Sequence, residues 1–228
     1  MAKRRTSGIQ RRERASSEAL NRRIDASSTG MSLPDWRLLA IGGVLVIGAI
    51  VVILVLLLGS GPSEYEGVQQ PDDGNAHVAI GTICRSAEAP CGADPYSSLP
   101  ATSGPHWDPS GIANWGVYET AQPESQLVHN LEHGGIVIWY DPEAVDADGV
   151  AELEQYVRTQ VATGISGRFK FIVTPWGGEE PLPSPVVVTS WRYLLELDGV
   201  DTAAIDGFAS EHYGLAPEPN GGPAPPAS

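Results

Sequence analysis

Histidines within a short segment carry the strongest chemical signal in the sequence. His129 and His133 stand four residues apart, with Glu132 beside them, in the string Val-His-Asn-Leu-Glu-His-Gly-Gly. In a helical turn, side chains at positions i and i+4 project from the same face. Imidazole nitrogens and carboxylate oxygens are ligands that Zn(II) and Cu(II) accept. The segment therefore predicts a metal-binding turn.

Other interpretations of this segment stay open. Its pattern H-x-x-E-H matches inverted zinc proteases, whose glutamate activates a metal-bound water. Those enzymes place the pattern in a long helix, whereas Gly134 and Gly135 follow here and leave room for a single turn before a strand. The imidazoles could instead be structural, because buried polar groups usually hydrogen-bond to the backbone. Spacing alone does not choose among a metal site, a structural pair and metal-free acid–base catalysis.

Longer strings around these residues are similar to a known family. Thr-Ser-Gly-Pro-His at 102–106 is followed in order by the string at 128–135, and the pairs Trp139-Tyr140 and Ser190-Trp191 come later. Together they resemble the bacterial domain-of-unknown-function family 3105 over roughly residues 75–219. The resemblance implies a secreted or membrane-anchored domain built around these motifs, and it implies no activity.

Both strings end in a histidine next to a glycine-containing turn, which suggests how they meet. If the two turns pack together, His106, His129 and His133 converge on one ion, with His77 or Glu132 as a further ligand. Three imidazoles with an oxygen ligand or a water suit Zn(II) or Cu(II). We therefore predict a Zn or Cu cofactor and leave open whether it serves metal handling, structure or a metal-dependent hydrolase.

The aromatic residues support a different hypothesis, a binding module of the cell envelope. They could line a groove for a glycan or a peptide if they are exposed as one patch. Packing in a core is the commoner fate of such side chains. The residues concerned are Trp107, Trp115, Tyr118, Trp139, Trp176 and Trp191.

The elements that must position these residues predict an α+β fold. Apolar and β-branched runs predict strands at 77–82, 135–140, 169–174 and 186–191, and the last two are expected to form an antiparallel pair. Apolar spacings of three and four predict helices at 150–161 and 202–213. We expect a small, mostly antiparallel sheet with two packed helices and a loop-rich N-terminal half, with a thioredoxin-like arrangement as the alternative.

The two cysteines, Cys84 and Cys91, favour a structural disulfide. Six residues separate them, so they do not form the C-x-x-C motif of redox dithiols. In an oxidising compartment such a pair usually closes a loop.

An apolar run near the N-terminus predicts the location of the protein. Residues 38–58 contain no charge, amide or hydroxyl, and a helix of this length crosses the hydrocarbon core of a bilayer. The basic residues precede it, so the positive-inside rule keeps 1–37 in the cytoplasm as a disordered tail. We expect a linker at 59–74, an extracytoplasmic domain at 75–215 and a Pro-rich disordered tail at 216–228.

Charge excludes one class of partner for the outer domain. The formal net charge is -14, yet residues 1–37 hold nine of the 14 Lys and Arg residues and only four of the 28 acidic ones. The rest of the chain keeps five basic and 24 acidic residues. Such a domain gains no counterion-release energy from phosphate backbones, so we expect no nucleic-acid partner.

Overall fold

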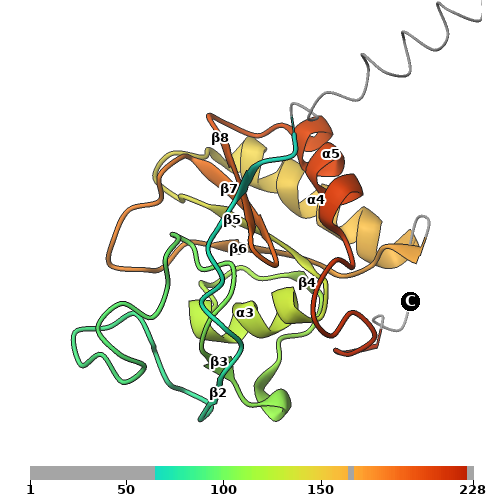
Figure 1. Ribbon diagram of the computed structural model, residues 1–228. Coiled ribbons are helices and arrows are strands. Elements are labelled where there is room, and N and C mark those ends of the chain that lie inside the picture. The colour runs from blue at the N-terminus through green and yellow to red at the C-terminus, as the bar shows by residue number, and fades with distance from the viewer. Residues whose placement is uncertain (1–64, 164–166, 225–228) are drawn as a thin grey trace, which may run out of the picture. The chain divides into compact units, whose positions relative to one another are not determined.

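The computed structural model describes residues 65–163 and 167–224, which fold as an α+β domain around a mixed six-stranded sheet (Figure 1). The predicted tail at 1–37 and the predicted span at 38–58 lie outside the described residues. Within the described ranges, no helix is both long and apolar enough to cross a bilayer. The membrane span therefore stays a prediction.

The sheet has the strand order β1-β8-β7-β5-β6-β4. Its centre is the buried strand β5, which pairs parallel with β6 and antiparallel with β7. These three strands consist almost entirely of β-branched and aromatic residues, which fit a pleated surface covered on both faces. The strands are β1 Val68–Gln69, β4 Gly116–Val117, β5 Ile136–Tyr140, β6 Phe171–Pro175, β7 Val186–Ser190 and β8 Tyr193–Leu197.

Helices cover both faces of this sheet. Helices α4 (Ala147–Thr163) and α5 (Thr202–His212) pack on the face that receives Ile136 and Ile138, whereas α3 (Glu124–Glu132) packs on the face that receives Val137 and Trp139 (Figure 1). Successive side chains of β5 thus point to opposite helix layers, as the period of a strand requires. The α3 layer is the one that carries the histidine motifs.

Two expectations about the elements need correction, and a third holds in part. The predicted pairing of 169–174 with 186–191 is wrong, because β5 lies between β6 and β7. The sheet is mixed: three of its five strand pairings are antiparallel, as expected, and two are parallel, because β4 and β5 both run parallel to β6. The single turn expected around His129 is a nine-residue helix, α3, so the described residues contain three α-helices where two were predicted.

The N-terminal part of the domain is an extended segment, residues 65–80, called the arm from here on. Its β1 pairs with β8, and its β2 (His77–Val78) forms a two-stranded parallel ladder with β3 (His106–Trp107). Figure 1 shows the arm in teal, running from the β8 edge of the sheet to β2 and β3. A 3-10 turn, η1 (Pro109–Gly111), follows β3.

The last described residues contact the domain through their backbone. Lys170, which is buried, donates hydrogen bonds from its Nζ to the carbonyls of His133, Pro219 and Gly221. The indole of Trp115 donates to the carbonyl of Pro223 at 3.0 Å. Of the stretch expected as a tail, 216–228, the structure describes 216–224. These residues contact the end of α3, the Trp115 ring and Lys170, the residue before β6.

Candidate metal centre

Four side chains from three elements converge where the arm meets β3 and α3. His77 comes from β2, His106 from β3, and His129 and Glu132 from α3. One nitrogen or oxygen of each lies within 4.8 Å of the others. The side chains of His106 and Glu132 are 0% and 1% exposed, and that of His77 is 41% exposed. Four of the five predicted ligands are therefore brought together.

His133, the fifth predicted ligand, is not part of this group. Helix α3 ends at Glu132, so His133 is the residue that caps it. Its Nδ1 lies 2.8 Å from the carbonyl oxygen of Glu218, and its ring stacks on that of His129 at 5.0 Å between centroids. Because the first and last residues of H-x-x-E-H do not share one site, the geometry gives no support to the inverted-protease interpretation.

The two buried imidazoles are held in the orientation of metal ligands. The Nδ1 of His106 lies 2.9 Å from the carbonyl oxygen of Gly104, and that of His129 lies 2.7 Å from the carbonyl oxygen of Trp107. A carbonyl only accepts, so each Nδ1 carries the proton and each Nε2 presents a lone pair. Histidines that bind metals commonly fix their tautomer in this way.

His106 and Glu132 bring a nitrogen and a carboxylate oxygen to a distance that a proton or a metal ion can bridge. Nε2 of His106 lies 3.0 Å from Oε2 of Glu132, so a lone pair faces a carboxylate at hydrogen-bond distance. Burial lowers the pKa of His106 and lowers that of His129 to about 4, which leaves both imidazoles neutral at pH 7. A tetrahedral shell with bonds of about 2.0–2.1 Å places neighbouring ligand atoms about 3.3 Å apart, close to the observed separation.

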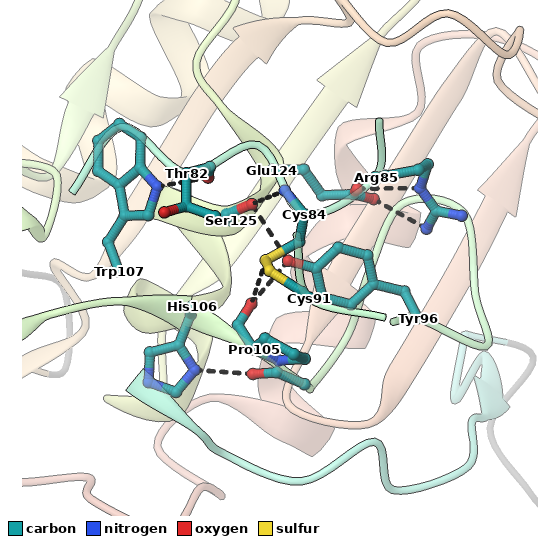
Figure 2. Close-up of a disulfide and its surroundings, with 11 residues drawn as sticks. Thr82, Cys84, Arg85, Cys91, Tyr96, Pro105, His106, Trp107, Glu124 and Ser125 are labelled. Atoms are coloured by element: carbon teal, nitrogen blue, oxygen red, sulfur yellow. Dashed lines mark hydrogen bonds and ion pairs between the residues drawn. A yellow bond between two sulfur atoms is a disulfide. The ribbon is translucent and has the colours of Figure 1, made fainter. Parts of the chain in front are cut away.

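The loop before His106 is held by Tyr96. The Tyr96 hydroxyl donates to the carbonyl of Pro105 at 2.6 Å (Figure 2). Gly104 has a φ of +110°, and a Cβ there would lie 2.9 Å from the Tyr96 ring. The Thr-Ser-Gly-Pro-His string therefore needs its glycine both for backbone conformation and for close packing. This packing fixes the strand that carries His106.

The predicted disulfide between Cys84 and Cys91 is present, and it lies next to this loop (Figure 2). The backbone NH of Cys84 donates to Oγ of Ser125 at 3.1 Å, and the hydroxyl groups of Ser125 and Tyr96 hydrogen-bond to each other at 3.2 Å. The disulfide loop is thus connected to the first turn of α3, the helix that carries two of the four candidate ligands.

Two glycines set the end of α3. Gly134 has a φ of +77° and donates its NH to the carbonyl of Leu131, as a left-handed residue at a helix end does. Gly135 donates to the carbonyl of Asn130, and a Cβ there would lie 2.5 Å from the Trp115 ring. The chain can therefore pass directly from the ligand helix into β5.

We expect Gly135→Ala to destabilise the domain. The added methyl group overlaps the ring of Trp115, which is itself buried, and overpacking of this kind costs about 1–3 kcal/mol. Urea unfolding of the full chain, followed by tryptophan fluorescence, measures the change. Gly199→Ala is the matched control, because a Cβ at Gly199 meets nothing within 4 Å. Equal midpoints for the two variants would contradict the packing argument.

The aromatic side chains do not gather in a surface groove. Four of the five tryptophans of the groove hypothesis are buried and belong to the packed interior: Trp107, Trp115, Trp139 and Trp191. Trp176 is half-buried, contacts Trp139 edge to face and lines a cleft of about 630 Å³ near the disulfide. Core packing accounts for most of these residues.

Fold and site together define an α+β domain whose α3 layer carries a group of three histidines and one glutamate. The family model described as "Protein of unknown function (DUF3105)" matches residues 90–224, and the chain belongs to this family. This confirms the resemblance inferred from the sequence strings. The match includes His106, His129 and Glu132, whereas His77 precedes it. Comparisons with curated proteins and with solved structures find no match.

Proposed function

We propose that this protein binds one transition-metal ion, Zn(II) or Cu(II), through His77, His106, His129 and Glu132. The observation that supports it most is the convergence of four potential ligand atoms within 4.8 Å, three of them on buried side chains. Residues 77–132 bring these atoms together from three separate elements, which a set of incidental surface groups would not do.

The donor set favours borderline metals. Three imidazole nitrogens and one carboxylate oxygen suit Zn(II) and Cu(II), whereas Ca(II) and Mg(II) prefer shells made of oxygen. Thiolate does not compete, because Cys84 and Cys91 are joined to each other. The carboxylate of Glu132 also offsets one positive charge of the ion in a buried setting, where an uncompensated charge is costly.

Metal analysis of the purified full chain tests this proposal. We expect about one equivalent of Zn or Cu per chain after loading and dialysis, and none after treatment with a chelator. Binding should also raise the unfolding midpoint, because a ligand that binds only the folded state stabilises it by about 2.7 kcal/mol at 100 times its dissociation constant. A chain that retains no Zn, Cu, Ni or Co under these conditions would disprove the proposal.

We propose further that the domain lies outside the cytoplasm, anchored by a single span at 38–58. The uncharged apolar run, the basic residues before it and the disulfide, which is typical of oxidising compartments, support this topology.

Protease added to intact cells tests the topology. We expect it to digest the domain and to leave the residues before the span protected. Digestion of the N-terminal tail with protection of the domain would reverse the orientation, and protection of both would place the whole chain inside.

A further inference from the structure

We propose, on the basis of the metal site above, that His77 is its exchangeable ligand. In this proposal His77 leaves the ion together with the arm, and the position it vacates admits a small Lewis base such as water, azide or an imidazole. The other three ligands keep the ion in place. The site then alternates between four protein ligands and three protein ligands with one open position.

The four candidate ligands are held very unequally. His106 and His129 are each fixed by an Nδ1–carbonyl hydrogen bond, and Glu132 lies on a buried helix face. The ring of His77 has no such hydrogen bond among the described residues. Its polar contact is with Oε2 of Glu132 at 4.0 Å, and its other contacts are with the rings of His106 and His129. The bound ion would be its main tether.

The arm that carries His77 is anchored only weakly by apolar contacts near the site, where Val78 is partly buried against the core. None of its residues from 65 to 80 is buried. Near His77, backbone hydrogen bonds from β3 and its flanks hold it, such as His106 N to Ala76 O at 3.0 Å and Asp108 N to Val78 O at 2.9 Å. Segments with exposed hydrogen bonds and few buried apolar contacts open at a small fraction of the global free energy of unfolding.

Without His77, the site keeps three protein ligands and gains an open coordination position. His106, His129 and Glu132 are three protein ligands, and the vacated position faces solvent because His77 is the exposed member of the group. Closed four-ligand sites are typical of structural metals, whereas three protein ligands with an open position are typical of sites where metals bind substrate or exchange. Movement of one arm residue therefore converts the first type into the second.

His77→Ala in the full chain tests the proposal. We expect the variant to retain about one equivalent of Zn(II) and to release it to a chelator on the order of 10–100-fold faster, by analogy with the loss of a supporting group. In its Co(II) form, added azide or imidazole should change the visible spectrum much more than in the unchanged chain.

A second variant loosens the arm without changing a ligand. Both carboxylate oxygens of Asp73 accept hydrogen bonds from Ser97. We expect Asp73→Ala to leave the metal content unchanged and to speed release about threefold to tenfold, the equivalent of one net hydrogen bond. Glu152→Ala, which removes an exposed carboxylate on α4, is the control and should release metal at the original rate.

The outcomes separate this inference from the proposed function. If His77→Ala loses metal as completely as a variant of a buried ligand, His77 is a fixed ligand and the inference is wrong. It is equally wrong if His77→Ala matches the unchanged chain in release rate and azide response, or if Asp73→Ala matches Glu152→Ala. In each of these cases the proposal that the unchanged chain binds a metal ion still stands. Absence of metal from the unchanged chain overturns both proposals.

Discussion

Replacing His129 with alanine is expected to abolish metal binding by the full chain, whereas replacing His133 with alanine should leave about one equivalent bound. The two imidazoles stack on each other at the end of α3, yet only that of His129 belongs to the ligand group. Its removal takes away a buried nitrogen donor that no neighbouring side chain replaces. Metal analysis after loading and dialysis, with isothermal titration for affinity, measures the difference.

The pair of variants makes this test specific, because both remove one imidazole from the same helix end. Glu132→Gln provides a second measurement in case His129→Ala folds poorly: it keeps the size of the side chain and removes the anionic ligand. We expect its affinity to fall at least as much as the loss of a group that supports a ligand lowers it, which is on the order of 10–100-fold. Equal metal loss in His129→Ala and His133→Ala would mean that the ligand set is different from the one proposed.

The contrast between these histidines shows what local spacing can predict. The helical turn correctly placed Glu132 beside His129, and both belong to the ligand group, because that relation depends only on helical geometry. The same reasoning placed His133 on the shared face. The two rings do stack on each other, but Nδ1 of His133 lies 2.8 Å from the carbonyl oxygen of Glu218. The ring of His133 is therefore engaged with the C-terminal segment and does not join the ligand group. The end of the helix is set here by Gly134, which lies against Gly214, and by Gly135, which lies against Trp115. No local pattern contains these contacts.

The length of helix α3 could not be predicted from the sequence for a related reason. Nearly all of its residues are buried, polar ones included: Ser125, Leu127, Val128, His129, Asn130, Leu131 and Glu132. The usual apolar stripe is therefore hidden, because the polar side chains on the inner faces make specific hydrogen bonds. Asn130, for example, exchanges two with the backbone of Ala113. A helix that carries a buried polar site does not show the periodicity by which helices are found.

The error in strand pairing has a different cause. Residues 171–175 and 186–190 are neighbours along the chain, and a Gly/Pro-rich connection between two strands usually indicates a hairpin. Instead, β5 occupies the position between them. Its residues are apolar on both sides, Ile136 and Ile138 on one and Val137 and Trp139 on the other. The continuous apolar run was the sign of a central strand, and such a strand must be paired along both edges.

The ion pair between Arg85 and Glu124 gave no sequence signal, because its members are 39 residues apart. Arg85 donates from Nε and Nη2 to the two carboxylate oxygens of Glu124, at 3.0 and 3.2 Å (Figure 2). One of those oxygens also accepts the NH of Ala101 at 2.6 Å. The pair joins the disulfide loop to the first residue of α3, the helix that bears His129 and Glu132.

We expect Arg85→Met to lower the free energy of unfolding by about 3 kcal/mol at pH 7. The substitution keeps an apolar stem and leaves the carboxylate of Glu124, which is 10% exposed, without its cation, and breaking a buried pair in this way typically costs about 3–5 kcal/mol. We take the lower end of this range of energies because Arg85 is 25% exposed, so the pair is only partly buried. Arg158→Met is the control: it removes an exposed i,i+4 pair with Glu154, which contributes about 0.3–0.5 kcal/mol.

The destabilisation of Arg85→Met should shrink as the pH falls. Burial raises the pKa of Glu124 above its ordinary value of 4.5, and Arg85 opposes this rise; removing the guanidinium therefore raises the pKa further. A carboxyl whose folded pKa lies above its unfolded pKa binds its proton more tightly in the folded state, so its contribution to stability increases as the pH drops through that interval. Urea unfolding at pH 7 and at pH 5 measures the effect. A difference between Arg85→Met and the unchanged chain that stays constant or grows at pH 5 would show that Glu124 is not the group left uncompensated.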